Sequence, residues 1–111
     1  MATEQKIVDY IVDQLTQAGT IRAKKMFGEY ALYCNEIVVA LVCDNQLFVK
    51  PTTSGRQLVD DCLESAPYPH AKPHFLITGD KLENHEWLCE LIKVTAHELA
   101  KTVKVKAKKN K

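Results

Sequence analysis

His85 and Cys89 are the residues whose types and spacing best suit metal chemistry, because they lie four positions apart. Side chains with this spacing stack on one side of a helix, where an imidazole and a thiolate can bind the same zinc ion. Two ligands do not make a site, and the chain contains no CxxC pair to supply others. We therefore predict no metal and no cofactor, and keep a metal-dependent or thiol enzyme as a third hypothesis.

The other cysteines, Cys34, Cys43 and Cys62, offer no nucleophile that the sequence can identify. A reactive thiol needs a lowered pKa and a base within hydrogen-bonding distance, and no local pattern indicates either. We expect all four cysteines to be reduced, buried packing residues. The chain also lacks the G-x-G-x-x-G, P-loop, H-E-x-x-H and G-x-S-x-G motifs, so we predict that the protein is not an enzyme.

Two further histidines, His70 and His74, flank Lys72 in a segment rich in proline. Residues 67–74 read Pro-Tyr-Pro-His-Ala-Lys-Pro-His, which cannot form a helix and predicts an extended loop. These side chains could recognise an anion or act as a base, but loop histidines are also often merely solvated. Both interpretations stay open.

The charges are unevenly distributed along the chain. Residues 1–100 contain nine Lys and Arg against 14 Asp and Glu, a net charge of −5, whereas residues 101–111 contain six lysines and no acid. Such a block is either a solvated tail or an arm that binds a polyanion without reading its sequence. The candidate nucleic-acid residues are Lys101, Lys104, Lys106, Lys108, Lys109 and Lys111.

The periodicity of apolar residues indicates which elements would position these groups. Spacings of three and four predict helices over residues 3–18 and 84–101, and alternation predicts strands over 21–34, 37–43, 46–50 and 74–78. The first strand contains a glycine, Gly28, that suggests either a bulge or a bend. A second helix is expected after Pro51, with Leu58, Val59, Cys62 and Leu63 on its inner side.

These elements follow the order α-β-β-β-α-β-α. Strands that adjoin in sequence favour a three-stranded antiparallel meander packed by helices, which is a two-layer α+β fold. The 111 residues, 46% hydrophobic and 26% charged, suffice for one domain over 1–100, followed by a basic tail over 101–111 that we predict to be disordered. Without an apolar leader or a long apolar span, the protein is expected to be cytoplasmic, with no membrane contact.

Residues 25–50, KMFGEYALYCNEIVVALVCDNQLFVK, resemble the amino-terminal domain of the TfoX/Sxy family. The matching positions are Lys25 to Gly28, Tyr30, Leu32, Tyr33, Ala40, Leu41, Leu47 and Lys50, and the Pro67-Tyr68 loop and the Trp87-Leu88 helix are also similar. Glu29 and Ala31 stand where the family commonly has glycine. The chain looks like a stand-alone amino-terminal domain, without the helical second domain of longer members.

The resemblance implies a regulatory protein without catalytic residues. Members regulate natural competence in bacteria and can act as coactivators beside the cyclic-AMP receptor protein. By this likeness the chain is expected to contact a protein partner in transcription, and its candidate contact residues are Lys24, Lys25, Glu29, Tyr68, His70 and Lys72. The alternative is non-specific nucleic-acid binding through the lysine-rich tail.

Overall fold

The structure, a computed structural model, describes residues 3–26, 28–59 and 63–109, with the backbone alone for 102–109. Its strands form one antiparallel sheet in the spatial order β1-β2-β3-β4-β6-β5. The elements, in chain order, are α1 (Gln5–Gln14), β1 (Ile21–Met26), β2 (Glu29–Cys34), β3 (Ile37–Cys43), β4 (Gln46–Val49), α2 (Thr53–Arg56), β5 (Leu63–Ser65), β6 (His74–Ile77), α3 (Gly79–Glu83) and α4 (His85–Lys109). The predicted α+β class is confirmed.

Two tight turns connect the central strands, each at a pair of polar residues that separates two apolar runs. Asn35 and Glu36 have φ angles of 52° and 69°, and Asp44 and Asn45 have 52° and 62°. Two consecutive residues with positive φ form a hairpin turn whose twist matches that of the flanking strands, and Asn and Asp tolerate this conformation well. These turns fix the antiparallel pairing of β2 with β3 and of β3 with β4.

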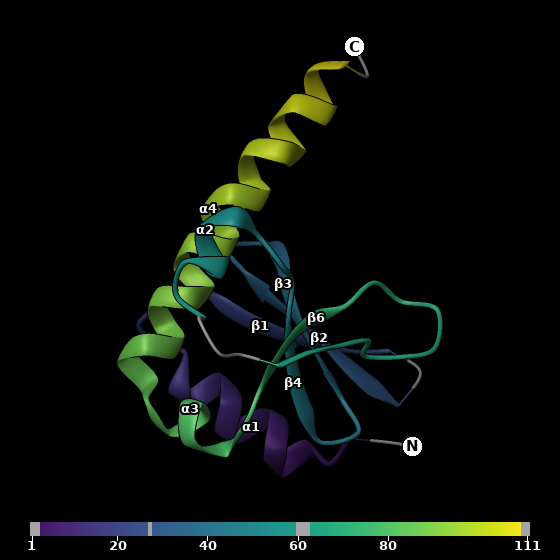
Figure 1. The fold of residues 1–111 in the computed structure, drawn as a ribbon, viewed down its shortest axis with the longest axis vertical. Helices are drawn as coiled ribbons and strands as arrows, with labels where there is room; N and C mark the ends of the chain where they lie inside the picture. Colours follow the sequence, from purple (N-terminus) through teal and green to yellow (C-terminus); the bar gives the residue numbers. More distant parts are fainter. Residues whose placement is uncertain (1–2, 27, 60–62, 110–111) are drawn as a thin grey trace.

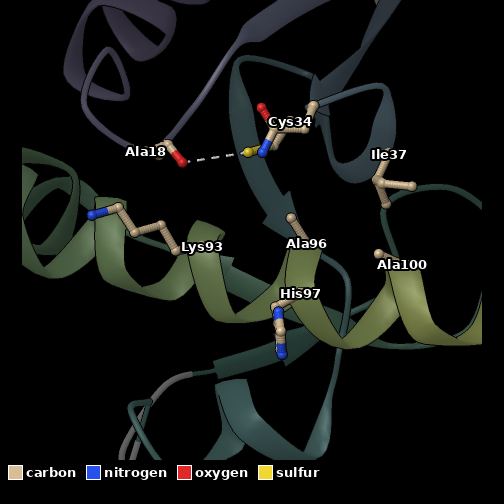
Figure 2. Close-up of a pocket in the computed structure, with 8 residues that line it drawn as sticks. Ala18, Cys34, Ile37, Lys93, Ala96, His97 and Ala100 are labelled. Carbon is tan, nitrogen blue, oxygen red and sulfur yellow. Dashed lines mark hydrogen bonds between the residues drawn. The ribbon is translucent and has the colours of Figure 1, made fainter.

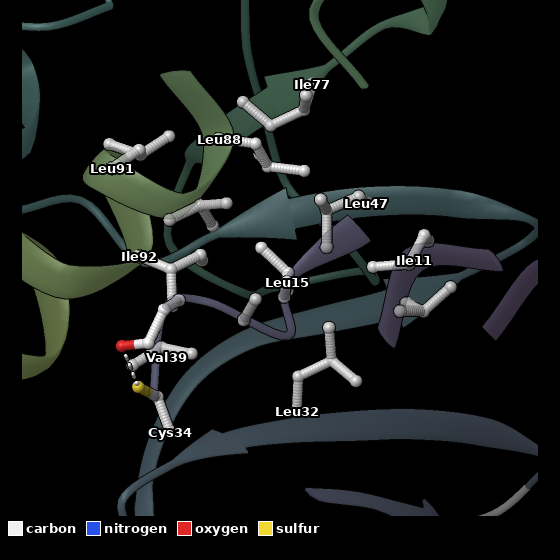
Figure 3. Packing of buried hydrophobic residues seen from close by; sticks show 14 of the residues in the cluster. Ile11, Leu15, Leu32, Cys34, Val39, Leu47, Ile77, Leu88, Leu91 and Ile92 are labelled. Atoms are coloured by element: carbon white, nitrogen blue, oxygen red, sulfur yellow. Dashed lines mark hydrogen bonds between the residues drawn. The ribbon is translucent and has the colours of Figure 1, made fainter. Parts of the chain in front are cut away.

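The helices lie together on one side of the sheet (Figure 1). Helix α1 buries Val8 and Ile11, with Leu15 buried directly after it, and α4 buries an apolar face against the same strands. Between them lies the core, in which side chains from α1, α4 and the central strands interdigitate (Figure 3). Its fully buried large side chains include Leu32, Val39, Leu47, Phe75, Leu88, Leu91 and Ile92.

The strand predicted over residues 21–34 is two strands, β1 and β2, joined at Gly28. Gly28 has a φ angle of 83°, a conformation that glycine adopts without the steric cost of a Cβ atom. The chain therefore reverses where the sequence suggested a bend, and Met26 pairs with Glu29. As a result the meander has four strands, not three.

The helix predicted after Pro51 is much shorter than expected. Thr52 caps this helix, since its hydroxyl accepts a hydrogen bond from the N–H of Gly55 at 2.9 Å, but α2 ends at Arg56. Val59 is buried as predicted, whereas Leu63 belongs to β5, which pairs with β6. Leu63 is therefore extended through its pairing with β6, although the local sequence pattern predicted a helix. Cys62 lies outside the described residues.

Helix α4 begins where the sequence indicated and ends later. The Asn84 side chain accepts a hydrogen bond from the N–H of Trp87 at 3.3 Å, as expected of a residue that caps the helix. The helix continues to Lys109 instead of ending near Lys101, so its last turns project beyond the sheet (Figure 1). The division between domain and tail stays a prediction. None of the described helices is long and apolar enough to cross a bilayer.

Candidate interaction surface

The face of the sheet that points away from the helices carries a continuous row of apolar side chains. Residues paired across neighbouring strands project to the same face of a sheet. The pairs give a row across all the strands, one residue from each: Lys24, Ala31, Leu41, Phe48, Leu76 and Leu63. We call this side of the sheet the open face. Five of its six row residues are apolar, although no helix covers them.

A loop rich in proline partly covers the open face. It connects β5 to β6 and extends away from the helices (Figure 1). Its residues Pro67 and Tyr68 approach Cys43 of β3, and Phe48 beneath the loop is 4% exposed. The end of the row nearest β5 is not covered, since Leu63 is 61% exposed.

A groove separates this loop from strands β1, β2 and β3. It has a volume of about 500 Å³ and is lined by Met26, Glu29, Tyr30, Leu41, Cys43, Pro67 and Tyr68, most of which are apolar. We call it the sheet groove. Met26 and Tyr68 are 40% and 56% exposed, so large apolar surface remains open to solvent at its rim. Apolar floors with a few polar groups at the edge are typical of places where another molecule binds.

Glu29 lines the sheet groove and is held by several hydrogen bonds. Its two carboxylate oxygens accept from the N–H of Asp44 at 3.2 Å, and the Thr3 hydroxyl donates to it as well. Thr3 also donates its N–H to the carbonyl of Gly28 and accepts from the N–H of Asn45. Glu29 therefore fastens the segment before α1 to the turn between β3 and β4, which gives it a structural role at the groove.

The structure brings together some of the six predicted contact residues. Glu29 and Tyr68 line the sheet groove, and Lys24 lies on the open face opposite Ala31. Lys25 pairs with Tyr30 and so projects to the other face, where it is exposed. His70 and Lys72 are exposed in the proline-rich loop, and the Lys72 carbonyl lies 2.8 Å from Nδ1 of His74.

The lysines proposed for nucleic acid lie along the end of the chain. Lys101 is exposed on α4, and positions 104, 106, 108 and 109 belong to the same helix. Lys111 lies outside the described residues. The helix carries these positions away from the sheet groove, so the two candidate surfaces are separate (Figure 1).

A second, smaller cavity lies between α4 and the turn that joins β2 to β3 (Figure 2). Its volume is about 330 Å³, and Lys93 and His97 line it from the helix. Cys34 donates a hydrogen bond to the carbonyl of Ala18 at 3.6 Å, and burial raises the pKa of the Cys34 thiol. Burial raises the pKa of the Cys43 thiol in the same way. Both thiols are therefore protonated near neutral pH, which suits packing and not nucleophilic attack.

His85 and Cys89 do not converge with further ligands in the described part of the chain, which holds no cluster of three or more His, Cys, Asp or Glu suited to a metal. The Cys89 thiol is 4% exposed and donates a hydrogen bond to the carbonyl of Gln14 at 3.2 Å. His85 is exposed at the start of α4. The thiol thus connects α4 to the end of α1.

Sequence reasoning missed most of the apolar residues of the sheet groove, including Met26, Leu41 and Cys43. Leu41 and Cys43 lie in residues 37–43, which are almost wholly apolar, so the sequence pattern did not distinguish the two faces of this strand. Which face the helices cover depends on the chain connections, and the strand pattern does not show it.

Two comparisons with known proteins found similarity over most of the chain. Residues 13–99 match the family described as the TfoX N-terminal domain. A relative from Spirochaeta aurantia, described as an uncharacterized 12.7 kDa protein in the trpE 5′ region, is 38% identical over 108 residues, which cover 97% of this chain and 93% of the relative. The matched residues include the whole sheet and the lining of the sheet groove, and they end before the lysine-rich segment that begins at Lys101. The chain belongs to the TfoX N-terminal domain family.

Proposed function

We propose that the protein is a non-enzymatic bacterial regulator that works in the cytoplasm by contacting a protein partner in transcription. Membership of the TfoX N-terminal domain family supports a regulatory role, and by likeness that role is in natural competence. The observation that carries the proposal is the sheet groove, with Met26 and Tyr68 exposed at its rim. A monomeric protein gains nothing in stability from such exposed apolar surface, whereas a binding protein uses it.

A photo-crosslinking amino acid placed at Tyr68 tests this proposal in living cells. The matched control is the same amino acid at Tyr10, which is 44% exposed on α1, away from the open face. We expect position 68 to capture a protein of the transcription machinery, identified by mass spectrometry, and position 10 to capture none. Equal capture at both positions, or the lack of any transcription protein at position 68, would contradict the proposal.

The alternative function, non-specific binding of nucleic acid, is favoured by one separate observation. Residues 101–111 carry six positive charges and no negative charge, and α4 extends positions 101–109 beyond the sheet. Six lysines that contact phosphates would give a log–log salt slope of about −5. Deletion of residues 101–111 should then abolish retention on DNA at low salt, while unchanged retention would exclude this function.

A further inference from the structure

Strand β1 forms one border of the sheet, and part of its backbone points outward. In an antiparallel pair, every second residue exchanges hydrogen bonds with the neighbouring strand, and the residues between direct their N–H and C=O groups away from it. The N–H of Asn35 donates to the carbonyl of Thr20, so Thr20 is a hydrogen-bonded position just before β1. Because hydrogen-bonded and outward-facing positions alternate from Thr20 onward, the residues with outward backbone groups are Ile21, Ala23 and Lys25.

These outward groups have no hydrogen-bond partner among the residues that the structure describes. An uncovered strand edge with free N–H and C=O groups is a template on which another extended chain can pair. The opposite border of the sheet is much shorter, because β5 has three residues whereas β1 has six. The β1 edge is therefore the longer of the two places where the sheet can grow.

The side chains along β1 give the edge a positive charge. The strand contains Arg22, Lys24 and Lys25 and no acidic residue. Arg22 is neutralised, since it forms a salt bridge with Glu36 at 3.1 Å and stacks over the Tyr33 ring at 4.2 Å. Lys24 and Lys25 project to opposite faces, and neither pairs with an acid in the described part of the chain. An acidic strand would therefore find a cation on each side.

A second copy of the same strand fits this edge poorly. Antiparallel pairing of two β1 strands would bring the cations of one against those of the other, and like charges placed opposite each other destabilise a sheet. An acidic segment has the complementary charge. The sheet groove adds a further feature, because Met26 ends β1 and lines that groove.

We infer that the β1 edge receives an extended acidic segment of the protein partner, which adds a seventh strand to the sheet. Backbone hydrogen bonds to Ile21, Ala23 and Lys25 supply the alignment, and carboxylates of the segment pair with Lys24 and Lys25. An apolar side chain at one end of the segment packs beside Met26 in the sheet groove. The inference rests on the proposed function and specifies the chemistry of its partner.

A competing explanation holds that the lysines only guard the strand edge against aggregation. On that explanation the edge binds nothing. The two explanations differ in their response to a short capped peptide, Val-Glu-Glu-Val-Glu-Glu-Val-Phe, added to isotope-labelled protein. We expect backbone amide shifts and slowed hydrogen exchange that centre on Ile21, Ala23 and Lys25. The absence of binding, or shifts centred elsewhere, would overturn the inference.

Replacement of Ala23 by proline tests the backbone contribution. Because the Ala23 N–H points outward, Ala23→Pro removes one donor for the peptide without removing a hydrogen bond to β2. We expect the variant to keep its core amide spectrum and to lose the peptide. A peptide that is N-methylated at alternate residues provides the same test on unaltered protein, and undiminished binding of this peptide would contradict strand addition.

The charge contribution is tested with the double variant Lys24→Glu/Lys25→Glu. Its matched control is Lys6→Glu/Lys93→Glu, which makes the same charge change at exposed positions on α1 and α4. We expect affinity for the acidic peptide to fall at least about tenfold in the first variant and to change little in the control. Equal losses in both variants would reject a role for the edge. Crosslinking at Tyr68 that survives Ala23→Pro would reject strand addition yet leave the proposed function standing.

Discussion

Leu32 and Leu63 are strand leucines on opposite faces of the same sheet. Leu32 is 0% exposed beneath α1 and α4, whereas Leu63 on the open face is 61% exposed. Leu32→Ala should lower the free energy of unfolding by about 2–5 kcal/mol, because it leaves a cavity in packed core. Leu63→Ala should change it by less than about 0.5 kcal/mol. Urea unfolding followed by circular dichroism measures both, and similar losses would contradict the assignment of the two faces.

Glu98 illustrates how one carboxylate on α4 holds another helix. It accepts hydrogen bonds from the N–H groups of Ser54 and Thr53 and from the Ser54 hydroxyl, all at 2.9–3.0 Å. The two N–H groups, and after them the Ser54 hydroxyl, lower the pKa of Glu98 below its ordinary value near 4.5. These bonds stabilise the ionised form, and only the folded protein provides them.

The pH dependence of stability follows from that lowered pKa. A carboxyl group with a lower pKa in the folded state contributes stability above its unfolded pKa and loses it as the pH falls through the folded pKa. We expect Glu98→Gln to lower the melting temperature at pH 7 and the deficit to disappear in acid below the folded pKa. Melting curves of both proteins at several pH values test this. A deficit that persists at the lowest pH would contradict an ionic origin.

The residues of the candidate surface were predictable only in part. Tyr68 was predictable because loops held on a rigid sheet commonly carry recognition residues, and it does line the sheet groove. Lys25 was expected beside Lys24, but neighbouring strand residues project to opposite faces, so only Lys24 is on the open face. Contact residues chosen from the sequence alone can therefore lie on opposite faces of the sheet, and only the strand register separates them.

Gly55 and Gly79 differ in how closely other atoms surround them. A Cβ atom added to Gly55 in α2 would lie 2.8 Å from Oγ1 of Thr52 and 3.2 Å from Cδ1 of Leu91, whereas one added to Gly79 in α3 would meet nothing within 4 Å. Gly55→Ala should therefore lower the free energy of unfolding by about 1–3 kcal/mol, since it displaces the capping hydroxyl. Gly79→Ala should raise it by about 0.4–1 kcal/mol. Thermal and urea unfolding of the two variants measure these changes in the free energy of unfolding. A stabilised Gly55→Ala variant would contradict the close packing of α2 on α4.

At the level of elements, the sequence predicted those helices, strands and turns that local periodicity and turn chemistry determine. The helices α1 and α4, the strands β3, β4 and β6 and both polar turns follow from periodicity and turn chemistry. Strand β5 could not be predicted, because its three residues are extended only through pairing with β6. Helix α2 ends at Arg56, so the residues that pair with β6 are not part of it.

At the scale of the whole molecule, the hydrophobic cluster extends along α4 as far as Ala96 among the residues whose side chains the structure describes, and Lys101 is exposed. Deletion of residues 101–111 should therefore leave the free energy of unfolding within about 0.5 kcal/mol of its original value. The same deletion changes the net charge from +1 to −5. The two free energies of unfolding should therefore be compared at moderate salt, where exposed charges are screened. A loss greater than about 1 kcal/mol in urea unfolding would show that the segment packs on the body.

The position of α4 in the sequence has a consequence for synthesis. Leu88, Leu91 and Ile92 cover the centre of the sheet, yet the ribosome makes them after every strand. Until they emerge, the apolar side of the paired strands is only partly covered, and the exposed remainder can bind chaperones or other unfinished chains. Premature termination before His85 would therefore yield aggregates, not a smaller working protein.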